Sequence, residues 1–283
     1  MTGRDKEQAS TRFREEDAET YYDNEDSTYR AFWDKEGSLH WGYFDQSTGD
    51  DFLAASANWN LLMLARSGID ANSVVLDLGC GNGNTPMWLT KQRSCRVTGV
   101  DLSGVRIRNA REAASKLEPE VASRLVFEKA SATDLPFPDG TFSHVWSQAT
   151  IYHVPDKHKV LAEVSRVIRA GGTFIFDDLT KPKPKVSARA QKYVYDRLLF
   201  DTPFSFEGYQ TALKAQGFQI ANAEDLSAHL ATSYRKLGEM ASAATAGGKG
   251  DFSALAEAYR HMIAAVEDQE LGWASYVCRK AAG

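Results

Sequence analysis

The sequence predicts an α/β protein with a mostly parallel sheet and helices on both of its faces. Short β-branched runs alternate with helix-like stretches, which is the pattern of parallel strands joined by crossover helices. The strand-like runs are nearly continuous in apolar residues, as expected when both faces of a sheet are covered. A glycine-rich turn, in VVLDLGCGNGN at 74–84, follows the first of these runs.

The expected elements follow one another regularly in the first two thirds of the chain and less regularly afterwards. Strands are expected at 74–79, 95–103, 124–130, 142–148 and 172–178. Helices are expected between them at 85–92, 104–117 and 156–169. Beyond a Pro- and Lys-rich run, we expect a helix at 207–217 that ends at Gly217, a strand at 218–226, a small-residue loop at 241–251, a helix at 252–268 and a last strand at 271–280.

The 283 residues are enough for one large domain with a substantial core. Residues 21–44 contain eight Phe, Trp or Tyr side chains, so residues 1–50 are expected to form an aromatic, helical lid. Residues 51–283 are expected to form the α/β domain. Two segments, at about 179–206 and 228–268, resemble additions that cover the ends of the strands, where ligands bind in open α/β sheets.

Composition and charge exclude several classes of protein. The formal net charge of −5 leaves no basic surface for nucleic acid. The three cysteines have neither a metal-ligand spacing nor the pattern of a disulfide framework, which indicates free thiols and no metal site. The sequence contains no run of 18 apolar residues, so no membrane span is expected. The polar start lacks the apolar core of a signal peptide. These features predict a cytoplasmic protein.

The glycine-rich turn has two possible explanations: an ordinary turn, or a backbone that must approach a ligand closely. Asp101 lies 18 residues beyond Gly83, at the end of the second predicted strand. An acid in this position can accept hydrogen bonds from the two hydroxyls of a ribose, or it can cap the following helix. Taken together, the glycine-rich turn and the acid favour a nucleoside cofactor.

The segment DLGCGNG resembles the first motif of the class I S-adenosylmethionine-dependent methyltransferases. Gly171-Gly172 and DLPFPDGTF at 134–142 are also similar to that family, and the resemblance covers roughly residues 70–180. It implies S-adenosyl-L-methionine as the cofactor and a Rossmann-like seven-stranded sheet in the order 3-2-1-4-5-7-6. The last strand of such a sheet is antiparallel to its neighbours, and FQIANAEDL and LGWASYVCRK would be the final two strands.

The resemblance also implies roles for individual residues. Asp77 would orient the glycine loop and the ammonium group of the cofactor. Ser131 and Ala132 would flank the adenine, and Gln148 would lie near the methionine part. Most relatives carry Asp where Ser131 stands, so the adenine amino group is expected to bond a hydroxyl or a backbone carbonyl instead. The expected cofactor-binding residues are Asp77, Gly79, Cys80, Gly81, Asp101, Leu102, Ser131, Ala132, Gln148 and Trp33.

The acceptor side resembles small-molecule methyltransferases through Tyr22, Trp33 and LHWGY at 39–43. WSQATIYHVPDKHKVL at 146–161 and LGWASYVCRK look most like the sarcosine/dimethylglycine N-methyltransferases. The expected catalytic residues are His153, as a proton relay that titrates near ~6.5, and Tyr22, as its partner in a lid latch. The expected substrate-binding residues are His40, Trp41, Tyr152 and Asp178.

Several alternatives remain open at this stage. The aromatic residues of 21–44 can pack the core rather than surround a substrate, and His153 can have a purely structural role. The basic run at 181–197 is either a solvated face or a cationic wall for an acceptor carboxylate. The protein can also be a C-, S- or O-methyltransferase of a secondary metabolite, sulfur compound, sterol or prenyl-quinone, or a nucleoside-binding protein without catalytic activity.

Overall fold

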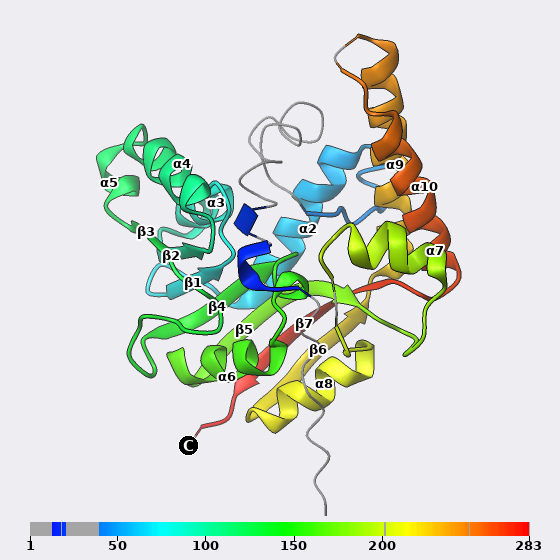
Figure 1. Cartoon of the computed structure of the whole chain (residues 1–283). Helices are drawn as coiled ribbons and strands as arrows, with labels where there is room; N and C mark the ends of the chain where they lie inside the picture. Colours follow the sequence, from blue (N-terminus) through cyan, green and yellow to red (C-terminus); the bar gives the residue numbers. More distant parts are fainter. Residues whose placement is uncertain (1–12, 18, 21–39, 201, 249, 283) are drawn as a thin grey trace, which may run out of the picture.

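A seven-stranded sheet in the order β3-β2-β1-β4-β5-β7-β6 lies at the centre of the computed structural model (Figure 1). This is the order that the resemblance implied, and β7 is antiparallel to both of its neighbours. The strands are β1 (Val74–Leu78), β2 (Arg96–Asp101), β3 (Leu125–Lys129), β4 (Phe142–Gln148), β5 (Ile168–Thr180), β6 (Phe218–Asp225) and β7 (Gly272–Lys280). The structure describes residues 13–17, 19–20, 40–200, 202–248 and 250–282.

Helices cover both faces of this sheet (Figure 1). They are α2 (Phe52–Ser67), α3 (Asn84–Arg93), α4 (Gly104–Ser115), α5 (Pro119–Ala122), α6 (Lys157–Val167), α7 (Ala188–Ala190), α8 (Phe206–Ala215), α9 (Ser227–Ala246) and α10 (Ser253–Glu267). Two short turns of other helical types are η1 (Ile151–His153) and η2 (Gln191–Asp196). In the described part of the chain, no helix is long and apolar enough to cross a membrane.

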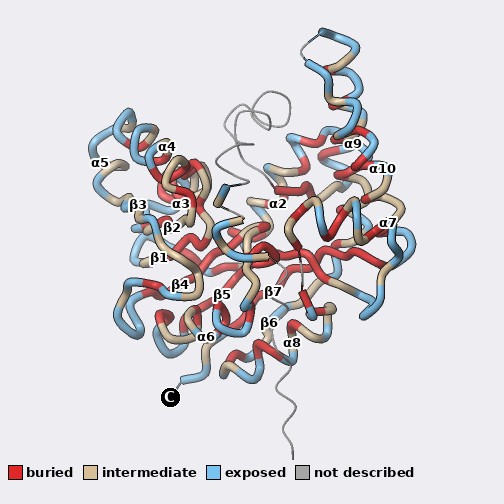
Figure 2. Tube along the Cα trace, in the orientation of Figure 1, coloured by how far each residue is buried: buried red, intermediate tan, exposed pale blue. Residues whose placement is uncertain are grey.

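The core lies on both sides of the sheet because successive residues of a strand face opposite sides. Val75 packs into a core that it shares with α2, α9 and α10. Leu76 and Leu78 pack into the opposite core, which α6 and α8 cover. Figure 2 shows β1, β4, β5 and β7 as largely buried segments at the centre of the molecule. Asp77 points to the same side as Val75, so its carboxyl group lies on the face that α2 covers.

The strand order places a ligand crevice beside β1. From β1 the chain winds outward through β2 to β3, and it then returns to β4 on the other side of β1. In open α/β sheets, ligands bind outside the carboxyl ends of the strands at such a point of reversal. Asp77, near the carboxyl end of β1, is in register with Gly99 of β2 and Trp146 of β4.

Two parts of the sequence-based prediction differ from the structure. The predicted loop at 241–251 is wrong over its first half, because α9 continues to Ala246. Alanine has the highest helix propensity, and the buried Ala241 and Ala244 fit the tight packing between α9 and α10. The fifth strand begins earlier than predicted, at Ile168.

Helix α2 was not predicted from the sequence. Its N-cap is Asp51, whose Oδ1 accepts a hydrogen bond from the backbone N–H of Ala54 at 3.0 Å. It is followed by Gly68 with φ 75°, a left-handed conformation that favours glycine after a helix. Trp59 of this helix is fully buried in the core.

The segments at 179–206 and 228–268 were expected to cover the strand ends. The first contains α7 and η2, and the second contains most of α9 and all of α10. The two long helices lie side by side, and their apolar residues share a core with α2 and η2 (Figure 1). Their function as a cover over the strand ends stays a prediction.

Candidate active site

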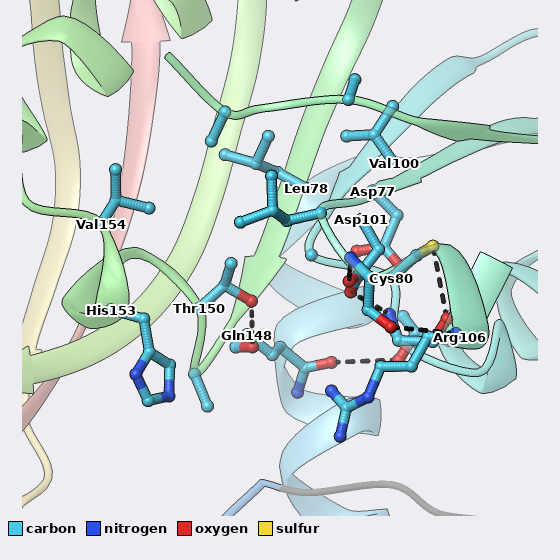
Figure 3. Close-up of a pocket in the computed structure, with 18 of the residues that line it drawn as sticks. Asp77, Leu78, Cys80, Val100, Asp101, Arg106, Gln148, Thr150, His153 and Val154 are labelled. Atoms are coloured by element: carbon cyan, nitrogen blue, oxygen red, sulfur yellow. Dashed lines mark hydrogen bonds between the residues drawn. The ribbon is translucent and has the colours of Figure 1, made fainter. Parts of the chain in front are cut away.

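The carboxyl ends of β1, β2 and β4 surround a cavity (Figure 3). The turn after β3 and the N-terminal segment also line it. It brings together most of the residues that the sequence predicted for the site. The predicted residues that line it are His40, Asp77, Gly79, Cys80, Gly81, Asp101, Leu102, Ser131, Ala132, Gln148 and His153. Tyr22 and Trp33 lie outside the described residues.

The glycines of the loop after β1 serve different purposes, although all three have positive φ, at 82° for Gly79, 53° for Gly81 and 84° for Gly83. A Cβ at Gly79 would lie 2.2 Å from the side chain of Thr150, and one at Gly83 would lie 2.9 Å from a side chain of α4. At Gly81 the nearest atom lies 3.8 Å away. Gly79 and Gly83 are therefore required by the packing of the protein itself, whereas Gly81 leaves space open toward the cavity.

Asp101 holds the glycine loop against the end of β2. Its Oδ2 accepts a hydrogen bond from the backbone N–H of Gly81 at 2.9 Å, and its Oδ1 accepts one from Ser103 at 2.8 Å. The N-cap of α4 is Ser103, which decides against the alternative that Asp101 caps this helix. Asp101 therefore fixes the position of the glycine loop at the carboxyl end of β2.

Asp77 is an acid in an environment that disfavours its charge. Its side chain is buried, and its Oδ2 has no hydrogen-bond partner among the described residues. Burial, followed by repulsion from Asp101, raises the pKa of Asp77 to about 8. A buried acceptor without a partner, in the wall of a cavity, fits a ligand that brings a positively charged donor to it.

The described cavity wall contains more carboxyl groups than basic groups. Among the described residues that line it, the carboxyl groups are those of Glu15, Glu19, Asp77 and Asp101, and the guanidinium is that of Arg106. Such an excess favours a cationic ligand. In the described part of the chain, no group of three or more His, Cys, Asp or Glu side chains could hold a metal ion.

A chain of hydrogen bonds links Gln148 and His40 of the cavity wall through Asn60, which does not itself line the cavity. The indole N–H of Trp146 donates to Oε1 of Gln148 at 2.9 Å, and Nε2 of Gln148 donates to Oδ1 of Asn60 at 2.9 Å. The Asn60 amide then contacts Nε2 of His40 at 3.4 Å. An indole N–H can only donate, so this direction determines the orientation of the Gln148 amide. Asn60 lies on α2 and was not found from the sequence.

His153 lies in the cavity wall but does not have the expected titration behaviour. Its ring is 7% exposed, and its pKa is lowered to about 3. Burial is the main cause, and the positive charges of Lys157 and Arg106 add to it, while a hydrogen bond to the backbone of Leu198 acts in the opposite direction. The expected pKa near ~6.5 is therefore wrong, and the imidazole is neutral at physiological pH.

The predicted substrate-binding residues Trp41, Tyr152 and Asp178 do not line the cavity. Oδ1 of Asp178 accepts a hydrogen bond from the backbone N–H of Tyr152 at 2.9 Å, and Oδ2 accepts one from the Tyr209 hydroxyl. The Trp41 ring packs against Tyr152 with the ring centroids 6.2 Å apart. All three residues are buried in the core, behind the wall that His40 and His153 form.

Asp177 is a buried residue that the sequence did not reveal. Its carboxylate accepts hydrogen bonds from the indole N–H groups of Trp59 at 2.7 Å and Trp273 at 3.0 Å, and from the backbone N–H of Ala149 at 3.2 Å. Ala149 lines the cavity and has φ 50°, an uncommon conformation for a residue with a side chain. Asp177 thus joins α2, β7 and the turn after β4.

The basic run at 181–197 faces away from the cavity. Lys183 donates to the backbone carbonyl of Asp268 at 2.6 Å, and Arg189 forms an ion pair with the Asp268 carboxylate. The ammonium groups of Lys181 and Lys192 lie over the rings of nearby tyrosines. No described residue of this run lines the cavity, which favours the explanation of a solvated face.

Comparisons with known proteins agree with this geometry. Residues 76–176 match a family model described as a methyltransferase domain. The chain is 30% identical over 204 residues to a 27-O-demethylrifamycin SV methyltransferase of Amycolatopsis mediterranei, covering 71% of this chain and 74% of that protein. It is 29% identical over 233 residues to a sarcosine/dimethylglycine N-methyltransferase of Halorhodospira halochloris, covering 81% of this chain and 82% of that protein.

A solved structure gives the same fold. A protein from Galdieria sulphuraria, assigned as a sarcosine dimethylglycine methyltransferase, superimposes with a TM-score of 0.80 at 20% identity. The match covers 94% of this chain and 98% of that one. The sequence matches, the strand order and a cavity suited to a cationic nucleoside together lead to one conclusion: the chain belongs to the S-adenosylmethionine-dependent methyltransferases that act on small molecules.

Proposed function

We propose that this methyltransferase transfers the methyl group to the nitrogen of a small amine, of which sarcosine and dimethylglycine are the first to test. The observation that carries the proposal is the 29% identity, over 81% of this chain, to a sarcosine/dimethylglycine N-methyltransferase. An amine attacks as a neutral group and becomes a cation, so the positive charge of the sulfonium moves to the acceptor nitrogen.

The residues around the cofactor have separable roles in this proposal. Asp77 would pair with the ammonium group, and Asp101 would accept hydrogen bonds from the ribose. The lack of a side chain at Gly81 would let the methionine part approach the backbone. The cofactor supplies a methyl group on positively charged sulfur, and this charge already activates the methyl for attack. The protein then contributes mainly positioning and the exclusion of water.

The neutral His153 suggests how the acceptor loses its proton. An aliphatic amine has a pKa near ~10 and is mostly protonated at neutral pH. An imidazole whose pKa is about 3 is a poor acceptor for that proton. We therefore assign the proton to water before the amine enters, and we assign to His153 the positioning of the neutral amine at the β4 end.

A carboxylate on the acceptor requires a cation, and Arg106 is the candidate. It lines the cavity, and its charge lowers the pKa of His153, so the guanidinium acts on the β4 end. Arg106→Lys would keep the charge but lose the planar fork that matches a carboxylate. We expect this variant to raise the KM of sarcosine while an amine without a carboxylate, such as dimethylamine, is unaffected.

The N-terminal segment is proposed to act as a lid. The support is that Glu15 and Glu19 line the cavity although they lie far from its other residues in the sequence. Limited proteolysis with and without S-adenosylhomocysteine tests this proposal. Slower cleavage within residues 1–45 in the presence of the ligand is expected, and equal cleavage in both states would argue against a lid.

The direct test of the acceptor is the formation of S-adenosylhomocysteine with a set of acceptors. Sarcosine and dimethylglycine are compared with 27-O-demethylrifamycin SV, because a relative that matches 71% of this chain methylates a hydroxyl. Turnover of an amine, with the methyl found on nitrogen by mass spectrometry, supports the proposal. Turnover of the hydroxyl compound with no turnover of either amine would make O-methylation of a secondary metabolite the function.

A further inference from the structure

A carboxylate from the N-terminal segment reaches the cavity beyond β3. Oε1 and Oε2 of Glu15 lie 2.9 Å and 2.7 Å from the Ser131 hydroxyl, and Oε1 lies 3.1 Å from the Thr133 hydroxyl. Glu19, one turn later, accepts a hydrogen bond from Lys129 at 2.6 Å. Glu15 and Ser131 are 116 positions apart in the sequence, and both line the cavity.

The strand order indicates which part of the cofactor lies at this end. Asp77 is on β1, Asp101 ends β2, and Ser131 follows β3, so the three side chains succeed one another along the sheet. His153 and Gln148 lie on the other side of β1, after β4. A cofactor with its methyl at β4, its ammonium at Asp77 and its ribose at Asp101 therefore extends its adenine to Ser131.

The Glu15 carboxylate retains capacity for a further donor at this place. Ser131 and Thr133 each have one hydroxyl proton that can be donated to Glu15. Their two hydroxyl oxygens lie 2.8 Å apart, so one of these protons can bond the other hydroxyl instead. A carboxylate offers about four lone-pair sites, so the two hydroxyls leave at least half of them unfilled. The exocyclic amino group of adenine is a donor with two protons.

The backbone nearby offers less. The carbonyl of Ser131 accepts a hydrogen bond from the backbone N–H of Asp134 at 3.2 Å. Ser131 itself has only one hydroxyl proton, which it directs to Glu15 or Thr133. The side chain of Ser131 therefore holds the acid in place rather than replacing it.

We propose that Glu15 recognises the adenine amino group of the cofactor, with Ser131 and Thr133 as the positioning residues that hold its carboxylate. The N-terminal segment then contributes directly to cofactor specificity, in addition to any role as a lid. This inference rests on the cofactor alone and is independent of the methyl acceptor.

The test compares the affinity of S-adenosylhomocysteine with that of its inosine counterpart, in which a carbonyl replaces the amino group. Isothermal calorimetry on the full chain should show that the adenosine compound binds more tightly by roughly ten- to a hundredfold, the range of a hydrogen bond to a charged group. Glu15→Gln should reduce this ratio to a few-fold, because the amide can also donate to the carbonyl.

Glu16→Gln is the matched control, since it removes the same charge from an exposed neighbouring residue that does not line the cavity. It should leave the ratio as in the unmodified protein. Ser131→Ala should lower the ratio in the unmodified protein and have no further effect in the Glu15→Gln background. Thermal unfolding without ligand confirms that each variant is folded.

Either of two results would overturn the proposal. In the first, Glu15→Gln weakens both compounds equally and leaves their ratio unchanged, which would make Glu15 only a tether for the segment. In the second, Glu16→Gln lowers the ratio as much as Glu15→Gln does, which would indicate a general effect of charge.

Discussion

At the β1–β3 end of the cavity, backbone groups and carboxyl groups from neighbouring strands line the wall, whereas at the β4 end uncharged side chains from distant parts of the chain line it together with Arg106. The first region contains Asp77, whose Oδ2 has no hydrogen-bond partner in the described structure. The second contains Gln148 and Asn60, which bond each other. In the proposed function, the first region suits the charge that the cofactor brings, while the side chains at the proposed acceptor end already bond one another.

This difference predicts separate effects of mutations on binding and on turnover. The largest effect is expected for Gly81→Val, because the added side chain would enter the space that the cofactor needs. The dissociation constant of S-adenosylhomocysteine, measured by calorimetry, should rise by more than about a hundredfold, since ligand contacts are lost as well as space. Stability should fall by only ~1–2 kcal/mol, the cost of a positive φ for a residue with a side chain.

Gly49→Val is the matched control for this variant, because Gly49 has φ 51° and no atom within 4 Å of an added Cβ. It carries the same backbone strain without facing the cavity. Equal loss of affinity in the two variants would show that strain, and not space for the cofactor, determines the effect.

Asp77→Asn should weaken the binding of S-adenosylhomocysteine by roughly ten- to a hundredfold and also stabilise the ligand-free protein at high pH. The pKa of Asp77 is raised from 3.8 to about 8 by folding. Its contribution to stability is therefore complete below pH ~4 and is lost as the pH rises through about 8. Urea unfolding at pH 8.5 should show a gain in stability for the variant, and the gain should be much smaller at pH 4, where Asp77 is protonated in the folded state and partly protonated in the unfolded state.

Asp50→Asn is the control, because it changes the same chemical group on the surface, where the Asp50 side chain is 87% exposed. It should change neither the affinity for S-adenosylhomocysteine nor the stability of the ligand-free protein. In the unmodified protein, affinity for the ligand should rise between pH 6 and 8, because the ammonium group requires an ionised Asp77. Asp77→Asn should lack this rise in affinity. A rise in affinity of the same size in Asp77→Asn would show that Asp77 does not bind the ammonium group.

His153→Ala should lower kcat by about tenfold and leave the affinity for S-adenosylhomocysteine nearly unchanged, because it removes positioning at the acceptor end. Since the pKa of His153 is about 3, neither protein should show a histidine inflection between pH 5 and 8 in the rate. His158→Ala is the control, because His158 packs against Phe204 outside the cavity. An inflection in the rate near pH 6.5 that disappears in His153→Ala would support the alternative that His153 acts as a proton relay.

Asn60→Ala should have the smallest effect, about three- to tenfold in kcat, which is the range of one lost neutral hydrogen bond. The variant breaks the link between Gln148 and His40 without touching the cofactor end. Asn58→Ala is the matched control on the same helix, because the Asn58 amide bonds Tyr43 and Asp45 instead. A loss of cofactor affinity in Asn60→Ala larger than its loss of kcat would contradict the separation of the two ends.

The two ends also differ in how far the sequence reveals them. The glycine loop and Asp101 were predictable because short-range rules apply to them: strand, turn and helix follow one another within about 30 residues, and the acid ends the next strand. The order of the sheet followed from the resemblance that these motifs support. The structure confirms both the order and the fold class.

The acceptor end was not predictable in the same way, because its properties arise from packing between distant segments. The low pKa of His153 is caused mainly by burial, which no local pattern encodes. Asp178 has the residue type of a ligand-binding acid, yet a backbone N–H and a tyrosine hydroxyl occupy its carboxylate. The capping residues Asp51 and Gly68 could have revealed α2, but not that Asn60 on this helix contacts Gln148.

The position of β7 between β5 and β6 has a consequence for the order of folding. β6 pairs only with β7 in the sheet, so it has no place there until β7 has been synthesised and inserted. The hairpin of α9 and α10 connects these two strands, and its closure brings them together. Completion of the sheet is therefore a long-range step that follows hairpin formation, and non-local pairing of this kind is slow. Until then, the unpaired edge of β5 is open to association between nascent chains.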